Sequence, residues 1–244
     1  MILNVVLKMI LRSWWRNKVF FLVSVASLAL GLACTNLLMT YFVHEHGLEG
    51  RNPDRDRMFF LRQDDPMTEG KRVAFAGAEI PPQLKQSYAE VEDFLRLGKL
   101  DLLYCKVNEQ KVEGDFKMLS ADTTLTSFFD YRTEEGSLSQ VLCQPGKVAL
   151  SEACARRLFG GKQAVGKQVE AHFRFGEART YEVAAVLKER EQSLLQFDML
   201  IAHDPDFFWG GLTLLKLTPG TDAGHLADKL NEDKVPTLMP GQTK

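Results

Sequence analysis

The chain has 244 residues, of which 45% are hydrophobic and 25% are charged. These values are ordinary for folded proteins, and they exclude a disordered chain, a collagen-like fibre and a disulfide-rich knot. Thirty basic and 32 acidic residues give a net charge of −2, which argues against a broad basic face for nucleic acid. The charge is unevenly placed, because residues 19–43 contain no Asp, Glu, Lys or Arg.

The uncharged segment 19–43 is long enough to cross a lipid bilayer as one helix. At about 1.5 Å per residue it spans a hydrocarbon core of about 30 Å. Its serines and threonines can bond to the helix backbone, and the small residues around Gly31 offer a surface on which a second helix could pack. The segment is longer than the apolar region of a cleaved secretory signal, and lipoprotein processing at Cys34 is disfavoured because Gly31 stands where leucine is usual. We therefore expect a retained transmembrane helix.

The flanks of this segment predict its orientation. Residues 1–18 contain four basic residues and no acidic residue, whereas residues 44–244 carry both signs. The positive-inside rule therefore places residues 1–18 in the cytoplasm and residues 44–244 outside it. Residues 1–18 are also predicted to form a helix in the cytoplasmic interface, although they could simply be the basic start of a membrane anchor. The stripe that favours this helix recurs every fourth residue, at Asn4, Lys8, Arg12 and Arg16.

The segment after the span is predicted to alternate between short strands and helices. Its first residues, 44–56, are polar and contain Gly, Pro and Asp, which is typical of a linker. Pro81 and Pro82 favour the start of a helix, because proline is tolerated in the first turn. In chain order we expect a buried strand at 58–61, a helix at 81–88, a strand at 91–97, and a hairpin of 102–107 with 116–119 that turns at 108–114.

Residues 147–202 carry the clearest local pattern. Ser151 can cap a helix whose last turn holds Arg156 and Arg157 and which ends at Gly160. A hairpin of 168–175 with 180–188 should turn at Gly176, and further strands are expected at 197–201 and 212–217. The side chains expected to face inward are Ala155, Leu158 and Phe159 on the helix, and Tyr181, Val183, Ala185 and Leu187 on one face of the second strand.

A last helix is predicted after Thr221 and Asp222, which can cap it. Its inward face would consist of Ala223, Leu226, Ala227 and Leu230. Strands and helices without a regular βαβ repeat indicate an α+β ectodomain with mixed sheets and short helices.

The sequence predicts no active site. Residues 161–168 match G-x-x-x-x-G-K but have Gln168 where a P-loop needs Ser or Thr, and they follow a predicted helix and precede a predicted strand, the reverse of a P-loop. His44 and His46 are spaced by two, so they do not share a helix face and are not expected to bind a metal. We therefore predict no catalytic residue, no cofactor-binding residue and no metal ligand.

The cysteines outside the span are odd in number. Cys34 lies within it, which leaves Cys105, Cys143 and Cys154. At most one disulfide can form among these three, and no Cys/His spacing typical of a zinc site is present.

Several segments resemble a known family of membrane proteins. Residues 11–18 (LRSWWRNK) and 28–33 (LALGLA) are similar to the first helix of FtsX/MacB-like ABC transporter permeases, and residues 54–60 (DRDRMFF) look like the strand that follows it. Five further segments resemble the MacB-like periplasmic core domain of this family. They are residues 148–160 (VALSEACARRLFG), 164–167 (AVGK), 181–188 (YEVAAVLK), 196–198 (QFD) and 215–222 (LKLTPGTD). In this order the motifs are specific and cover most of the chain.

The resemblance implies a permease subunit of the bacterial inner membrane that does not hydrolyse ATP. A cytoplasmic ABC ATPase would drive it, and ATP-driven motion would pass to the periplasmic domain for export of peptides, antibiotics or lipoproteins. It further implies two periplasmic lobes, at 44–120 and 121–208, with a segment at 209–244 that returns to the first lobe. Its implied partners are a second permease subunit, the lipid bilayer and a periplasmic adaptor, but no nucleic acid.

The sequence departs from the family pattern at its end. Family permeases return to the membrane with three more helices, whereas this sequence reaches Lys244 without a second apolar span. We expect a fragment of a longer permease or a shortened relative. The alternative is a single-pass anchored ectodomain that acts as a sensor or adaptor without an ATPase.

Overall fold

The computed structural model describes residues 18–47, 54–64, 72–161, 163–188, 195–205 and 210–233. The chain divides into two units, Met1–Gly50 and Arg51–Lys244. The expected cytoplasmic helix at 1–18 lies outside the described residues except for Lys18, and so does 234–244 of the expected return segment.

The first unit contains the predicted apolar helix, α2 (Lys18–Gly47). Its segment Lys18–Thr40 has a mean hydropathy of 2.0 and the length needed to cross a membrane, and most of its large apolar side chains are exposed. The hydroxyl groups of Ser27 and Thr35 donate to the carbonyl groups of Val23 and Gly31, as the sequence predicts. The helix continues through Gly47, so the prediction of a linker from His44 onward was wrong for its first four residues, because the backbone hydrogen bonds of a helix do not require an apolar sequence.

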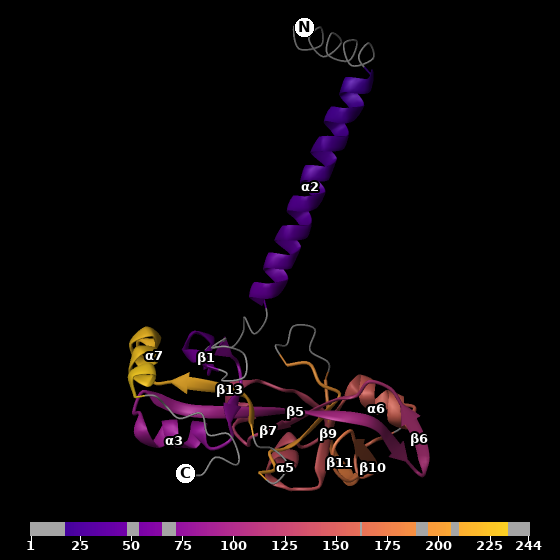
Figure 1. Cartoon of the computed structure of the whole chain (residues 1–244). Helices are drawn as coiled ribbons and strands as arrows, with labels where there is room; N and C mark the ends of the chain where they lie inside the picture. The colour runs from indigo at the N-terminus through magenta and orange to yellow at the C-terminus, as the bar shows by residue number, and fades with distance from the viewer. Residues whose placement is uncertain are drawn as a thin grey trace. The chain divides into compact units, whose positions relative to one another are not determined.

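The second unit is a large mixed sheet with short helices, which confirms the predicted α+β class (Figure 1). Its helical elements are η1 (Arg55–Arg57), α3 (Ile80–Ser87), α4 (Leu125–Phe128), α5 (Leu138–Cys143), α6 (Glu152–Phe159) and α7 (Ala223–Glu232). Its main strands are β1 (Met58–Phe60), β4 (Ala76–Gly77), β5 (Val91–Val107), β6 (Gln110–Glu113), β7 (Lys117–Ala121), β8 (Thr133–Gly136), β9 (Lys147–Ser151), β10 (Gln168–Phe173), β11 (Arg179–Leu187), β12 (Met199–Ala202) and β13 (Gly210–Leu217). A separate ribbon pairs β2 (Gln63–Asp64) with β3 (Arg72–Val73).

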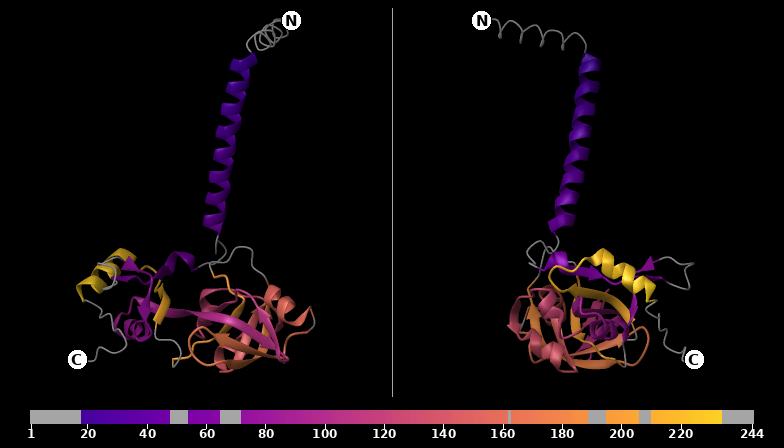
Figure 2. Two further views of the ribbon diagram at one scale, coloured as in Figure 1. Left: turned by 45° about the vertical axis from the view of Figure 1, so that its right-hand side comes forward. Right: turned by 90° about the vertical axis from the view of Figure 1, so that its left-hand side faces the viewer.

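Six of these strands close into a barrel. The neighbours in order are β5, β10, β11, β9, β12 and β7, and β7 pairs again with β5. All these pairs are antiparallel except β9 with β11 and β7 with β12. The left view of Figure 2 shows this curled part of the sheet to the right of α3 and α7.

Two apolar clusters form the core of the barrel and its outer cover. One cluster draws residues from all six barrel strands and from α6, as expected for the barrel interior, and includes Leu102, Met118, Val148, Leu158, Val169, Val183 and Ile201. The other packs α4 and α5 on the opposite face of the strands, through Phe128, Val141, Ala149, Ala184 and Leu200. Strands buried on both faces carry near-continuous apolar sequence, as β9 and β12 do.

A third apolar cluster lies beyond the barrel, where β13 and the start of β5 meet α3 and α7. Its buried members are Ile80, Leu84, Tyr88, Val91, Leu215, Leu217 and Leu226. The predicted helices at both sites are therefore confirmed, α3 with Pro81 and Pro82 in its first turn and α7 with the Asp222 carboxylate accepting from the N–H groups of Gly224 and His225. Whether the unit is best divided into lobes at residues 120 and 208 stays a prediction.

The structure corrects the predicted strands around residue 100. Segments 91–97 and 102–107 are one continuous strand, β5, rather than two. The turn at Asn108 and Glu109, both with positive φ, joins β5 to β6 instead of to 116–119. Strand β7 pairs with Leu97–Asp101 of β5, because long-range pairing carries the strand through Gly98 and Lys99, where the local apolar pattern breaks.

Three predictions of which side chains face inward were also wrong. Phe59 and Phe60 are each 40% exposed, because β1 is a short strand at one end of the sheet. In β11 the register shifts between Val183 and Ala185, so Val183 faces the barrel interior while Ala185 joins the outer cluster. On α7, Ala227 is exposed, whereas Leu226 is buried.

Candidate functional site: an ion-pair junction at the start of β5

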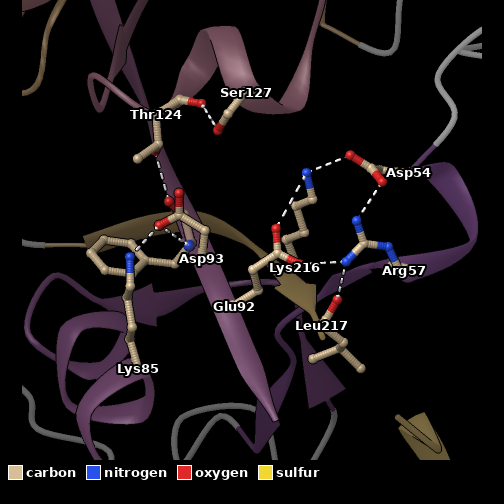
Figure 3. Close-up of polar contacts among 10 residues, drawn as sticks. Asp54, Arg57, Lys85, Glu92, Asp93, Thr124, Ser127, Lys216 and Leu217 are labelled. Atoms are coloured by element: carbon tan, nitrogen blue, oxygen red, sulfur yellow. Dashed lines mark hydrogen bonds and ion pairs between the residues drawn. The ribbon is translucent and has the colours of Figure 1, made fainter. Parts of the chain in front are cut away.

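Four charged side chains from three separate segments meet where β5 begins (Figure 3). Asp54 and Arg57 lie at either end of the η1 turn, Glu92 is the second residue of β5, and Lys216 is the next-to-last residue of β13. We call these four residues the β5 junction. It lies seven residues along the chain from Gly47, the end of α2.

Local structure explains why these groups converge. The N–H of Arg57 donates to the carbonyl of Asp54 at 2.9 Å, which closes the turn and returns Arg57 to the Asp54 side chain. Lys216 lies in register with Met58 of β1 and with Asp93 of β5, so it is flanked by strands on both sides. Its side chain is only 10% exposed, and a lysine so buried requires a negative partner.

The contacts of the junction form a closed set of two cations and two carboxylates. Lys216 Nζ donates to one oxygen of Asp54 and lies 3.7 Å from Glu92 Oε1. Arg57 donates to the other oxygen of Asp54, to Glu92, and to the carbonyl oxygen of Leu217 at 2.7 Å. The segment that follows α2 is thereby bonded to both β5 and β13.

The junction also shifts the acidity of its members. The hydrogen bond from Lys216, and then the one from Arg57, lowers the pKa of the Asp54 carboxyl below its ordinary value. The hydrogen bond to Asp54, and then the one to Glu92, raises the pKa of Arg57. Both shifts keep these groups charged over the ordinary range of pH, so the junction does not lose its attraction near neutrality.

A second set of contacts ties α7 to the residues just before β5. Tyr88 Oη donates to Asp233 Oδ2 at 2.6 Å, and Lys229 Nζ donates to Glu90 Oε1 at 3.0 Å. The bond to Asp233, followed by burial, raises the pKa of Tyr88 to about 12. The segment that enters the unit and the helix that ends its described part are therefore both held by residues 88–92.

β5 connects this junction to the barrel. The strand has 17 residues and runs from Val91 to Val107, roughly 50 Å of extended chain at about 3.3 Å per residue. Its first part pairs with β13 and its second part with β10, so it belongs both to the region of the junction and to the barrel (Figure 1). A displacement at Glu92 would thus be carried by a continuous hydrogen-bonded strand.

The structure reports on each candidate that the sequence analysis weighed. The P-loop-like segment lies between α6 and β10, in the reversed order that was predicted. The N–H of Gly166 donates to the carbonyl of Val183 at 2.8 Å and that of Lys167 to Ala164 at 3.1 Å, so these amides are used within the fold. Lys162 lies outside the described residues.

The histidines and cysteines do not assemble into a centre within the described ranges. No group of three or more His, Cys, Asp and Glu suited to a metal occurs among them, and the absence of a metal site stays a prediction. All four cysteines are free, with Cys105 and Cys154 buried and Cys143 exposed. Burial raises the pKa of the Cys105 thiol to about 12 and raises that of Cys154 as well, so both are poor nucleophiles.

Sequence reasoning did not find the β5 junction. Two features could have indicated it. Lys216 stands between leucines in an apolar strand, and two glutamates, Glu90 and Glu92, flank the first residue of β5. Neither feature reveals its partners, because Asp54 and Lys216 are 162 residues apart.

The fold and the site define an α+β domain preceded by an apolar helix, with the segment after that helix bonded to a central strand. A family model described as the MacB-like periplasmic core domain matches residues 21–233. The chain belongs to this family. It is a periplasmic domain of an ABC-type permease of the MacB/FtsX class, and it is not itself the ATPase.

Two of the solved structures that resemble this chain have TM-scores above 0.5 and show the same fold at low identity. A domain described as coming from a permease protein of Porphyromonas gingivalis is 17% identical, with a TM-score of 0.59, over 78% of this chain and 84% of that one. The extracellular domain of the noncanonic ABC-type transporter YknZ from Gram-positive bacteria is 17% identical, with a TM-score of 0.52, over 74% and 94%. The periplasmic region of MacB from Actinobacillus actinomycetemcomitans is 11% identical, with a TM-score of 0.48, over 65% and 72%. No curated protein matches the chain.

Proposed function

We propose that this chain is the N-terminal part of a permease subunit that passes ATP-driven motion from the membrane to its periplasmic domain, for export of peptides, antibiotics or lipoproteins. In this proposal residues 1–18 lie in the cytoplasmic interface near an ABC ATPase, α2 crosses the inner membrane, and residues 44–244 are periplasmic. The subunit pairs with a second permease subunit and engages a periplasmic adaptor.

The observation that supports motion transfer is the β5 junction. A helix that moves in the membrane can act on the domain through the chain that follows it, and Asp54 and Arg57 bond that chain to β5 and β13. Because β5 continues into the barrel, force applied at Asp54 has a direct path to the far part of the domain. The exchange of one ion-pair arrangement for another is a common basis of conformational switching.

The first test concerns the partner. Sequencing the genomic DNA beside this coding region should reveal a frame for an ATPase with a complete P-loop, and the encoded protein should bind the full-length permease in lipid nanodiscs. The absence of such a frame, or failure of the two proteins to associate, would favour the anchored sensor or adaptor.

The second test concerns the route. In the complex, a non-hydrolysed ATP analogue should change hydrogen exchange of the amides in β5 and β13, as measured by mass spectrometry. Lys216→Met should abolish this change while leaving ATPase binding intact. Lys147→Met is the matched control, because Lys147 also pairs with a carboxylate, Glu182, at 2.8 Å but lies outside the junction. Equal responses of the two variants would exclude the junction as the route.

A further inference from the structure

A cavity of about 530 Å³ lies where β5 passes from β13 into the barrel. Its walls come from the middle of β5, from β7 and β13, and from the end of β10 and the residues after it. The volume is in the range of roughly 300–1,000 Å³ that is usual for sites of small ligands, which also favour the meeting points of separate parts of a fold.

The wall of this cavity is almost wholly apolar. Among the described side chains that line it, only Lys99 and Asp101 are polar, and both are exposed, by 76% and 55%. The described part of the wall therefore offers a bound molecule no buried side chain that donates or accepts a hydrogen bond, and a polar ligand group placed against it would lose its bonds to water without replacement. The apolar side chains of the wall include Leu97, Leu100, Leu119, Phe173 and Leu212.

The rim of the cavity differs from its wall. Phe175 is 78% exposed, a large apolar surface turned to water at the edge of an apolar cavity. Lys99 Nζ lies 3.6 Å from Asp101, too far for a hydrogen bond, and an exposed pair of this kind is weak. The ammonium group of Lys99 can therefore form an ion pair with a second negatively charged group at the rim.

We propose that this cavity binds the hydrocarbon chain of a single-chain anionic amphiphile of the fatty-acid type, with the head group of the molecule at the Lys99 ammonium. The claim that this amphiphile is a cargo of the permease rests on the proposed function. The claim that the cavity binds it does not. A ligand there would contact β13, β5 and the barrel strands at once. It would therefore contact β5, the strand along which we propose that motion passes from the β5 junction.

The experiment uses the full chain in lipid nanodiscs, without detergent, and a fatty acid that carries a photoactivatable diazirine on its chain. After irradiation, mass spectrometry should find labelled peptides that contain Leu119 or the segment from Phe173 to Phe175. Excess dodecanoate should suppress this labelling, and dodecanol, which lacks the charge, should suppress it less. Labelling only of α2, or labelling that dodecanoate does not suppress, would overturn the proposal.

Two variants with matched controls separate the wall from the rim. Leu119→Gln places an amide in the wall and should remove most of the labelling, whereas Leu103→Gln, at a leucine that is 49% exposed and outside the cavity, should not. Lys99→Glu should weaken binding of the acid about fivefold, the factor for a surface ion pair near the upper end of its strength. Lys111→Glu is its control, because Lys111 likewise pairs with an exposed carboxylate two residues on, Glu113.

Thermal unfolding establishes that each variant is folded. Because the Lys99 side chain is exposed, its substitution leaves the packing of the core unchanged. If dodecanol competes as well as dodecanoate and Lys99→Glu binds as the unaltered chain does, the assignment of an anionic amphiphile is wrong. Failure of binding leaves the ATPase association test unaffected, and failure of that association leaves this binding test unaffected.

Discussion

Lys216 shows how strongly one buried charge can determine its surroundings. The strand that holds it is otherwise apolar, and its ammonium group can be buried only because Asp54 and Glu92 lie beside it. Neither carboxylate is near Lys216 in sequence. The role of the residue therefore follows from the tertiary structure, although its presence in an apolar strand is visible in the sequence.

His203 should make the domain sensitive to mild acid. Burial, and then the positive charge of Arg96, lowers its pKa, although Asp122 and Asp204 act in the opposite direction. The unfolded chain takes up this proton near pH 6.5, whereas the folded chain resists it to a lower pH. The contribution of His203 to stability is therefore present above about pH 6.5 and falls as the pH drops through that value towards the folded pKa.

Thermal unfolding between pH 7.5 and about 5 measures this dependence. Carboxyl groups with a lowered pKa, such as Asp54, lose their contribution to stability only at a pH below this range. His203→Gln should flatten the curve of melting temperature against pH. His225→Gln, at an exposed position on α7, should leave the slope as it is. An unchanged slope in the His203 variant would contradict the assignment.

The cysteines should differ sharply in reactivity. A charged, water-soluble thiol reagent is expected to modify Cys143 in the folded protein, because Cys105 and Cys154 are buried with raised pKa values and Cys34 lies in the apolar helix. Mass spectrometry of the labelled chain measures this, and denaturation should expose the remaining thiols. Labelling of Cys105 or Cys154 as fast as Cys143 would show that the barrel interior opens readily.

At the scale of elements, α6 is the part that local sequence predicts best. The Ser151 hydroxyl accepts from the N–H of Cys154, Gly160 adopts the left-handed conformation with φ of 65°, and Arg156 and Arg157 stand in the last turn as predicted. These features act over a single turn, so each can be read from adjacent residues.

The cap of α6 is expected to contribute measurably to stability. Ser151→Ala should lower the free energy of unfolding by about 1 kcal/mol, since it leaves the N–H of Cys154 without its partner. Ser151→Asp should retain most of the stabilisation that the cap provides. Ser137→Ala is the matched control, because Ser137 precedes α5 without forming a side-chain cap. Chemical denaturation measures both, and an equal loss in the two alanine variants would contradict the role of the cap.

The elements that sequence predicted poorly are those that depend on distant partners. The hairpin of β10 and β11 has both strands and its turn at Gly176 close together in the chain, and it was found. β5 was divided in two, since its middle residues lack an apolar alternation and are held as a strand by β7. The face exchange in β11 depends on its pairing with β9, which no alternation rule contains.

At the scale of the whole molecule, one buried ion pair joins three parts of the domain. Arg96 of β5 binds both carboxylate oxygens of Asp122, which follows β7, and also donates to the carbonyl of Ala78 at 2.9 Å, just before α3. The side chains are 18% and 10% exposed. The pair fixes the region of the third apolar cluster against the barrel.

Removing this pair should destabilise the entire fold. Arg96→Met is expected to lower the free energy of unfolding by about 3 kcal/mol, because it leaves the Asp122 carboxylate buried with its principal partner lost. Arg179→Met, at an ion pair with Asp204 that is about 40% exposed, should lower it by less than about 1 kcal/mol. Denaturant unfolding compares the two, and an equal cost would contradict the special role of Arg96.

The sequence by itself determined the features that depend on residues close together in the chain. These are the apolar helix, the α+β class, the capped helices α6 and α7, the hairpin of β10 and β11, and the order of motifs that identifies the family. The helices and the hairpin follow from periodicity, capping or turn chemistry among neighbouring residues. The class follows from the order of these elements, and the family from the resemblance of the ordered motifs to known permeases.

Only the tertiary structure decided the closed barrel, the β5 junction and the apolar cavity. Each of them brings together residues far apart in the chain, such as Met118 with Met199 in the barrel, Asp54 with Lys216 in the junction, and Leu97 with Leu212 beside the cavity. The order of strands in a sheet sets these meetings, and local propensity does not encode that order. The physical reason is that burial and pairing act between surfaces of the folded chain, so the partner of a residue is fixed only when the whole sheet has formed.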